Sequence, residues 1–312
     1  MKTPLVAVID IGSNSIKILV TTRNAAGELI DLASATIEAR ISAGIHQREP
    51  ELSAEGMQRG LEAILDLLAI AQPHAPTITQ LVATSAVRDA RNGAQFRELV
   101  ESATGCPIRI LSGREEADFI GQGLICDPNL SALTDFYLFD LGGGSLECLA
   151  FAQRRIQQAV SLQLGCVRLT EKHVSDRTAP IAADALAEIA HDTITTLREH
   201  PFAFELDKWA VAVGTGGTIT TARAMLAAKR NQTMAESDSR LKVADLRLLL
   251  VDVARLTLDD RRKIPGLSSA RADVFPAALA TLIAVADEGN LTSFQHSFYN
   301  LRYGVAAELL GA

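Results

Sequence analysis

The chain has 312 residues, a formal net charge of −7, 48% hydrophobic residues and only 4% aromatic residues. This length is sufficient for two domains with their own cores, and the aliphatic composition is typical of an α/β protein. The acidic balance argues against a general binder of nucleic acid or of anionic membranes, whose affinity would depend on a basic surface. A polyanion would therefore have to bind at a local basic site.

The cysteine, histidine and hydropathy patterns indicate the compartment in which the protein works and whether it binds zinc. The cysteines form no C-x-x-C pair and stand in apolar surroundings, which predicts buried free thiols in a reducing compartment: Cys106, Cys126, Cys148 and Cys166. The six histidines show no zinc-binding spacing. The apolar run after Lys2 ends at Asp10, so no signal peptide is recognised, and no segment is apolar for long enough to span a membrane. We expect a soluble, cytoplasmic protein.

The first half of the chain reads as three strands followed by alternating helices and strands. Strands are predicted at 5–11, 15–22 and 29–41, with a turn at 24–27. The later elements are a helix at 53–71, a strand at 78–84, a helix at 94–104, a strand at 108–111 and a helix at 113–125. This succession predicts a ribonuclease-H-like α/β domain.

The second half repeats that order from Phe136. Strands are predicted at 136–141, 145–152 and 156–163, and a helix at 180–199. The strand 208–213 enters the glycine-rich turn 214–218, which precedes a helix. Lys229 to Arg240 lacks apolar periodicity and is predicted to be a mobile loop. Helices at 243–255, 270–288 and 300–311 complete the chain, and Phe202, Phe204 and Trp209 are expected in the core.

The stretch 136–147 is the most informative part of the chain. An apolar strand ends at Asp140 and leads at once into a turn of three glycines and a serine. Such a turn lets main-chain N–H groups converge on an anion such as phosphate. Asp140 and Glu147 would flank this turn with oxygen ligands that suit Mg²⁺. The alternative is a glycine-rich hairpin in which Asp140 binds its own turn.

The start of the chain contains a second copy of this pattern. Asp10, Gly12 and Ser15 match Asp140, Gly142 and Ser145, and both copies run from strand through turn to strand. The 130-residue offset between them is the size of a domain. Two equivalent domains would place two phosphate-binding hairpins across one cleft.

Three further positions are candidates for chemistry. Ser112 and Glu115 have capping-box spacing, so Glu115 has a structural role, whereas Glu116 is either a first-turn acid favoured by the helix dipole or a general base. Arg88 follows a strand end and could neutralise a phosphoryl group, or it could be a solvated helix-start residue. Lys17 reaches a phosphate or lies on the solvent face of an edge strand. The glycine-rich turn 214–218, which precedes a helix, is a third possible anion site.

Eight stretches, in order, resemble the exopolyphosphatase and guanosine pentaphosphate phosphohydrolase (Ppx/GppA) family of the actin and sugar-kinase superfamily. They are VAVIDIGSNSIKILV, VATSAVRDARN, ILSGREEADFIGQG, YLFDLGGGSLE, LQLGCVRLTEK, VAVGTGGTITTA, RADVFPAALATL and NLRYGVAAELL, and together they run from about residue 5 to residue 310. The resemblance implies two ribonuclease-H-like (actin-like ATPase) domains with an interdomain cleft. We expect one domain at 1–125 with a returning helix at 297–312, and the other at 126–296.

The resemblance also implies roles for individual residues. Glu116 is expected to activate water, with Arg88 and Asn92 at family positions after the strand. Asp10, Asp140 and Glu147 are expected to hold Mg²⁺, directly or through water. The expected phosphate-binding residues are Gly12, Ser13, Asn14, Ser15, Lys17, Gly142, Gly143, Gly144, Ser145, Gly216, Gly217 and Thr218.

The implied activity is Mg²⁺-dependent release of terminal orthophosphate from polyphosphate, or conversion of pppGpp to ppGpp. Two rivals stay open, a phosphotransferase that uses the same cleft and a non-catalytic sensor of (p)ppGpp or another nucleotide. The sequence does not distinguish polyphosphate from guanosine penta- or tetraphosphate, and it leaves open Mn²⁺ in place of Mg²⁺, a need for K⁺, and a homodimer. No nucleic-acid or membrane partner is expected.

Overall fold

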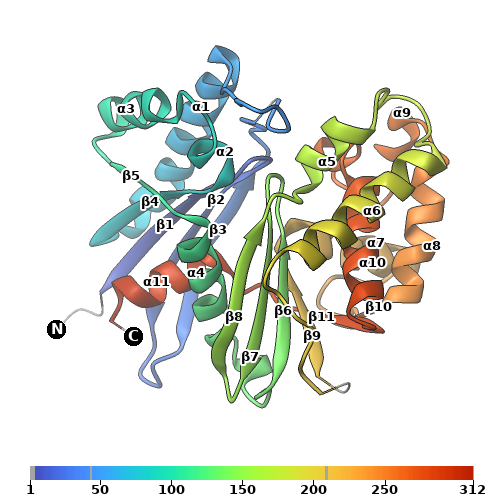
Figure 1. Ribbon diagram of the computed structural model, residues 1–312. Coiled ribbons are helices and arrows are strands. Elements are labelled where there is room, and N and C mark those ends of the chain that lie inside the picture. The colour runs from blue at the N-terminus through green and yellow to red at the C-terminus, as the bar shows by residue number, and fades with distance from the viewer. Residues whose placement is uncertain (1–3, 43, 208–209, 312) are drawn as a thin grey trace. The chain divides into compact units, whose positions relative to one another are not determined.

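The computed structural model describes residues 4–42, 44–207 and 210–311 (Figure 1). The chain divides into two compact units, which we call the first unit (Met1–Ala132 with Tyr299–Ala312) and the second unit (Leu133–Phe298). The sequence placed these boundaries at 125/126 and 296/297. Between the two positions of the first boundary, Asp127 caps the short helix η2 (Pro128–Leu130) by accepting a hydrogen bond from the Asn129 N–H at 2.9 Å, and this turn follows directly on the helix that ends at Ile125.

The first unit has a five-stranded sheet in the order β3-β2-β1-β4-β5. The antiparallel meander is β1 (Leu5–Ile11), β2 (Ile16–Arg23) and β3 (Leu29–Ile37), and β4 (Ile78–Ala83) and β5 (Ile108–Ile110) add parallel to β1. This confirms the predicted ribonuclease-H-like order. β3 ends earlier than predicted because Arg40 takes a positive φ of 42° and its N–H bonds the Asn14 carbonyl at 2.9 Å.

Helices pack on both faces of this sheet (Figure 1). Alternate β1 side chains Ala7, Ile9 and Ile11 join a buried cluster with side chains of α1 (Ala54–Ala71) and α3 (Gly93–Thr104). The intervening side chains therefore face the opposite side, where α11 (Leu301–Leu309) packs against β1 and against α4 (Gly113–Ile125). Asp10 lies at the end of β1 on this second face. The remaining helices of the unit are α2 (Ser85–Arg88) and the short turn η1 (Gln72–His74).

The second unit has a six-stranded sheet in the order β10-β11-β9-β6-β7-β8. Its meander is β6 (Phe136–Leu141), β7 (Leu146–Ala152) and β8 (Arg155–Leu162), as predicted, and β9 (Val211–Thr215) adds parallel to β6. The predicted strand 208–213 corresponds to β9, which begins at Val211. Lys208 and Trp209 lie outside the described residues. The sequence did not predict β10 (Arg240–Lys242) or β11 (Ser293–His296), which are too short to show alternation.

Helix α10 (Phe275–Glu288) is the centre of the helical part of this unit (Figure 1). It packs against four helices, α5 (Cys166–His173), α6 (Ala183–Glu199), α7 (Gly216–Lys229) and α8 (Val243–Ala254). Every side chain from Phe275 to Ala286 is buried, which is characteristic of a helix enclosed on all sides. It begins later than predicted because Pro276 occupies the first turn and 269–271 form the separate turn η3 (Ser269–Arg271). A further short helix is α9 (Leu258–Arg261), and neither α5 nor α9 was predicted.

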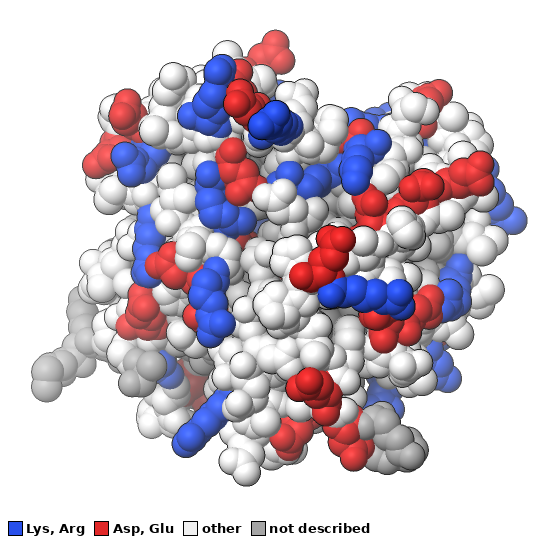
Figure 2. Space-filling view, in the orientation of Figure 1, with Lys and Arg blue, Asp and Glu red and all other residues white. Residues whose placement is uncertain are grey.

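Several other expectations are decided by the structure. All four cysteines are free, but Cys106 and Cys126 are only partly buried, so the prediction of four buried thiols is wrong for these two. Both lie near helix or strand ends, where packing is incomplete. Within the described residues, no helix combines the length and apolarity needed to cross a membrane. On the face shown in Figure 2, acidic and basic side chains are interspersed and do not form one basic area.

Candidate functional site

The turn between β1 and β2 presents unpaired backbone donors. The Gly12 N–H closes the turn on the Ser15 carbonyl at 3.2 Å, and the Ser42 hydroxyl donates to the Ser13 carbonyl at 3.1 Å. The N–H groups of Ser13, Asn14 and Ser15 have no acceptor among the described residues. Because unpaired N–H groups that are nearly buried are costly, this turn is suited to an anion.

The turn between β6 and β7 has the same construction in the second unit. The Gly142 N–H closes it on the Ser145 carbonyl at 3.0 Å. Its carbonyl groups are occupied by the start of α5: the Cys166 N–H donates to Gly142 at 3.0 Å and the Val167 N–H to Gly143 at 2.9 Å. With the carbonyls held on that side, the N–H groups of the turn are left for an external acceptor.

Helix α5 approaches this turn closely because Gly165 precedes it. A Cβ on Gly165 would overlap the backbone of Gly143 and Gly144, and Arg168 Nε donates to the Gly144 carbonyl at 3.0 Å. Sequence reasoning missed this supporting role of Gly165 and Arg168. The LQLGCVR stretch was the available signal, but a single glycine before a short helix does not reveal what it touches.

The two hairpins differ in the charge opposite the strand-end acid. Asp140 pairs with Glu147 across β6 and β7, whereas the equivalent Asp10 pairs with Lys17 across β1 and β2. Residues directly opposite each other in an antiparallel pair project from the same face. Two carboxylates therefore share a face in the second unit, and Glu147 is buried, with one oxygen accepting from the Ser161 hydroxyl at 2.7 Å.

Asp10 is a desolvated carboxylate in the first unit. The residue is 8% exposed, and its carboxylate accepts no hydrogen bond from the described residues. Burial raises the pKa of Asp10, opposed by the nearby positive charges of Lys17 and Arg302. Arg302 belongs to α11, donates to the Ile18 carbonyl at 2.8 Å and leaves its buried Nε without a partner.

Lys17 is half-buried, and its ammonium makes no hydrogen bond or ion pair with the described residues. The alternative that it lies on an edge strand is wrong, because β2 is flanked by β1 and β3. An ammonium at this position, opposite Asp10, is available to a phosphate group.

Glu116 points inward from the first turn of α4. It is 5% exposed, and its Oε2 accepts from Arg88 Nη1 at 2.7 Å. Arg88 also donates to the Leu111 carbonyl at 3.1 Å and to Asp89 at 3.3 Å. Glu116 is thus both an acid in the first turn of α4, where the helix dipole favours it, and a buried carboxylate paired with an arginine, so its role as a general base stays a prediction. Arg88 is not a solvated helix-start residue, because it is fixed over the same strand ends.

The neighbouring Glu115 has the structural role that its spacing predicted. Its carboxylate accepts from the Ser112 N–H and hydroxyl, both at 2.9 Å, while the Ser112 hydroxyl accepts from the Glu115 N–H. The complete capping box, together with Arg109, lowers the pKa of Glu115 to about 2. This cap fixes the first turn of α4 and thereby the direction of Glu116.

Some predicted phosphate-binding side chains are committed elsewhere. The Asn14 side chain donates to Glu38 at 2.6 Å and accepts from Arg40 at 3.2 Å, so these two residues hold it in place. The Thr218 hydroxyl donates to the Leu141 carbonyl at 3.2 Å and thereby ties α7 to β6. Asn92, a family position, bonds the N–H and carbonyl of Leu52, both at 2.8 Å, and braces the chain before α1.

The first turn of α7 contacts the second-unit acid directly. Gly216 has φ +83°, and a Cβ there would overlap Asp140 Oδ1. The carboxylate of Asp140 therefore lies against the helix start, where Gly216, Gly217 and Thr218 were predicted to bind phosphate. Helix N-termini carry free N–H groups and a positive dipole end, so this turn also suits an anion.

Arg271 completes this end of the second unit and was not predicted. Its guanidinium occupies the space beside Gly217 that a Cβ would fill, and the residue is 7% exposed. The guanidinium makes no hydrogen bond with the described residues, and its Nε is fully buried. A buried cation without a protein partner, set over a helix N-terminus, points to an anionic ligand. The arginine of RADVF was the available signal, but its distance in sequence from the turn concealed the contact.

Topology explains why these residues gather. β1, β4 and β5 run parallel, so Asp10, Arg88 and Glu116 all follow the carboxyl ends of neighbouring strands in the first unit. β6 and β9 are also parallel, which brings Asp140 to the start of α7 in the second unit. Ligands bind at such strand ends in α/β sheets. Each unit thus brings its own candidate site residues together at the carboxyl ends of its parallel strands. Within the described residues, no three His, Cys, Asp or Glu side chains form a metal-binding group.

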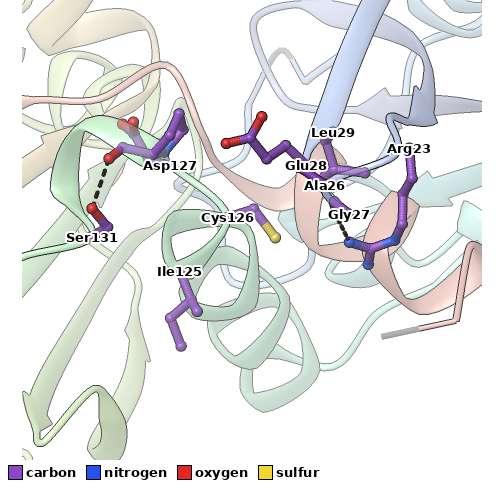
Figure 3. Close-up of a pocket in the computed structure, with 10 residues that line it drawn as sticks. Arg23, Ala26, Gly27, Glu28, Leu29, Ile125, Cys126, Asp127 and Ser131 are labelled. Atoms are coloured by element: carbon purple, nitrogen blue, oxygen red, sulfur yellow. Dashed lines mark hydrogen bonds between the residues drawn. The ribbon is translucent and has the colours of Figure 1, made fainter.

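One pocket of the first unit is separate from these sets. It has a volume of about 440 Å³ and lies between the β2–β3 turn and the end of α4 (Figure 3). The side chain of Arg23 turns onto the Gly27 carbonyl at 2.6 Å, and the Ser131 hydroxyl donates to Pro128 at 2.9 Å. None of the predicted site residues lines this pocket.

Comparisons with known proteins agree with the resemblance seen in the sequence. The model of the Ppx/GppA phosphatase family matches residues 20–312. The structure is similar to an exopolyphosphatase from Cytophaga hutchinsonii, with a TM-score of 0.88 and 21% identity over 98% of this chain and 97% of that chain. For an exopolyphosphatase-like protein the TM-score is 0.86 with 25% identity, covering 98% of both chains. For the PPX-GPPA enzyme of Aquifex aeolicus it is 0.77 with 20% identity over 98% of this chain and 99% of that chain. These similarities establish the fold.

Proposed function

Because the chain belongs to the Ppx/GppA phosphatase family and is a phosphoanhydride hydrolase, we propose that it releases terminal orthophosphate from inorganic polyphosphate or from pppGpp. Hydrolysis is the first of the three functions that the sequence left open. The observation that carries the proposal is Glu116, buried and paired with Arg88, in the same unit as a turn with three unpaired N–H groups.

Glu116 acts as the general base in this proposal. The ion pair with Arg88 holds its carboxylate in one orientation, which a general base needs in order to act on a bound water molecule. Glu116 takes a proton from that water while the water oxygen attacks the terminal phosphorus. The bond between this phosphorus and the bridging oxygen then breaks, and the shortened phosphate chain leaves with the bonding electrons. Arg88 then stabilises negative charge on the transferring phosphoryl group.

Backbone donors and unpaired cations bind the phosphate chain in this proposal. In the first unit, the proposed phosphate-binding groups are the turn 12–15 and Lys17. In the second unit, they are the turn 142–145, the start of α7 and Arg271. N–H groups pre-arranged in a turn bind anions without reorganisation, and a guanidinium adds charge-assisted hydrogen bonds.

Mg²⁺ is the proposed metal, with Asp10, Asp140 and Glu147 as its candidate ligands. The donor set fits, because Asp140 and Glu147 offer hard oxygen ligands from one face, and Mg²⁺ is usually bound by one or two carboxylates, water and substrate phosphates. When bound, the ion would neutralise phosphate charge and polarise the scissile bond. Mn²⁺ has similar ligand preferences and is the natural alternative.

A cytoplasmic location belongs to the same proposal. It is supported by four free cysteines, which persist in a reducing compartment.

The test is orthophosphate release by the purified chain with Mg²⁺, from polyphosphate and pppGpp in parallel. Glu116→Gln keeps the hydrogen bond from Arg88 but removes the base, and we expect turnover to fall by about 10²–10⁴-fold. Glu115→Gln is the matched control, one residue away and confined to the helix cap. We expect that control to retain most turnover. Equal rates in wild type and Glu116→Gln would exclude Glu116 as the base.

A further inference from the structure

A chain of hydrogen bonds ends on the first residue of α7. Arg223 Nη1 lies 3.1 Å from His296 Nδ1, and His296 Nε2 lies 3.0 Å from the Thr220 hydroxyl. That hydroxyl donates in turn to the Gly216 carbonyl at 2.8 Å. Arg223 and His296 are 8% and 4% exposed, so this network of hydrogen bonds is shielded from solvent.

The chemistry of the partners fixes the direction of every bond. A carbonyl only accepts, so the single hydroxyl proton of Thr220 goes to Gly216 and His296 Nε2 must donate to Thr220. A guanidinium only donates, so His296 Nδ1 must accept from Arg223. His296 is therefore neutral and carries its proton on Nε2. Burial, together with the positive charge of Arg223, lowers the pKa of His296 to about 4, in agreement with this state.

Arg223 is itself held by the segment that the sequence predicted to be mobile. Its Nη2 donates to the carbonyls of Met234 and Ser237, both at 2.8 Å, and its Nε donates to the Ser237 hydroxyl at 3.0 Å. The backbone N–H of His296 donates to the Ser239 carbonyl in the same segment at 2.7 Å. The segment 234–239, the end of β11 and the start of α7 are thus connected through two buried side chains.

The sheet brings this hydrogen-bond network to the ligand-binding edge of the second unit. β11 pairs parallel to β9, with His296 opposite Gly214, so His296 follows the same strand ends as Asp140 and Thr215. The Asp140 carboxylate packs against Gly216, where it fills the space that a Cβ would occupy. A displacement of the Gly216 peptide would therefore move both the N–H groups of this turn and the surface against which Asp140 rests.

We propose that Arg223, His296 and Thr220 are positioning residues that fix the Gly216 peptide, and with it the phosphate-binding first turn of α7 and the Asp140 carboxylate. This inference rests on the proposed function of that turn, and adds to it three residues that do not themselves touch substrate. His296 works as a rigid, uncharged connector, because its ring carries one donor and one acceptor at a fixed separation.

The first test uses Thr220, whose hydroxyl is the last link. Thr220→Val removes the hydroxyl at nearly constant volume, whereas Thr220→Ser retains it. We expect Thr220→Val to lower kcat/KM for polyphosphate by about 10-fold or more, because a misplacement of about 1 Å at an active site can cost 10²-fold. Thr220→Ser should stay within about 2-fold of wild type, since it keeps both hydrogen bonds.

A matched control separates positioning from simple loss of a buried hydroxyl. Thr193 is fully buried in α6 and donates to the Ile189 carbonyl at 2.8 Å, the same i to i−4 bond that Thr220 makes. Thr193→Val should therefore resemble Thr220→Val in thermal stability but leave kcat/KM unchanged. If both valine variants lower kcat/KM equally, or if Thr220→Val and Thr220→Ser are equally active, the positioning role is refuted.

A second readout does not depend on turnover. Long-range ¹H–¹⁵N NMR correlations of the histidine rings report the tautomer, and we expect His296 to be neutral with its proton on Nε2. His296→Gln supplies an amide N–H at the position of Nε2, and His296→Asn supplies an acceptor at the position of Nδ1. The Gly216 amide resonance should therefore stay closer to wild type in His296→Gln. A proton on Nδ1, or an unmoved Gly216 amide in Thr220→Val, would overturn the inference.

The two readouts also separate the two proposals. A wild-type protein that releases no orthophosphate from polyphosphate or pppGpp would refute the proposed function. The same protein with the Nε2 tautomer and a displaced Gly216 amide in Thr220→Val would still show that this hydrogen-bond network sets the turn.

Discussion

Gly216→Ala is the sharpest perturbation of the candidate site, because it acts on a backbone conformation and a side-chain contact together. Gly216 has φ +83°, where an alanine costs about 1–2 kcal/mol. Its new Cβ would also lie well inside 3.0 Å of Asp140 Oδ1, an overlap of more than about 1 Å against an ordinary contact distance of about 3.5 Å. Relieving such an overlap in a packed region costs about 1–3 kcal/mol.

We therefore expect Gly216→Ala to lower the free energy of unfolding by about 2–5 kcal/mol, measured by urea denaturation. Because Asp140 or the turn must move, kcat/KM for polyphosphate should fall by about 10²-fold in the phosphate-release assay. Both effects come from one added methyl group, which carries no charge and changes no protein donor or acceptor.

Gly27→Ala is the matched control for the free-energy cost of placing an alanine at a positive φ. Gly27 has φ +84°, but a Cβ there would meet no atom within 4 Å. This variant should lose only about 1–2 kcal/mol and retain full activity. If the two variants lose the same stability and both stay active, Asp140 is not held against the start of α7 as the structure indicates, and the argument for that half of the site fails.

Three further predictions address other parts of the molecule. Since the pKa of His296 falls from 6.5 in the unfolded chain to about 4, the unfolded state binds more protons in that window and stability falls as pH drops through it. Between pH 7 and 4.5, wild type should lose about 2.5 kcal/mol more unfolding free energy than His296→Gln in urea titrations, and equal losses would show that His296 does not titrate this way. Arg271→Met removes a buried guanidinium without a protein partner, so it should raise stability by about 1 kcal/mol while raising KM for polyphosphate; a loss of stability with unchanged KM would assign Arg271 to the fold. Ser112→Ala opens the capping box and should cost about 1 kcal/mol in thermal or urea denaturation, and no measurable cost would mean that Glu115 does not depend on this cap.

The prediction of the fold from the sequence rested on short-range patterns. Runs such as 5–11 and 136–141 are apolar, lie next to glycine turns and repeat at a domain-sized offset, so both meanders were predicted correctly. Helix α4 and its capping box could also be predicted, because Ser112 and Glu115, which form the box, are only three residues apart in the sequence. β10 and β11 were missed because three or four residues carry no periodicity, and only pairing with β9 makes them strands.

Local structures and their chemistry could therefore be predicted from the residues alone: two strands that end in an acid, two glycine turns and an acid pair at a helix start. Which of those groups come into contact depends on how the strands and helices pack. Glu116 faces Arg88 because β4 and β5 are parallel neighbours. Arg271 reaches the start of α7, and His296 reaches Thr220, across more than fifty residues of chain. Sequence spacing encodes neighbours within a strand or a helical turn, whereas these contacts are set by sheet order and helix packing, which depend on the whole buried core.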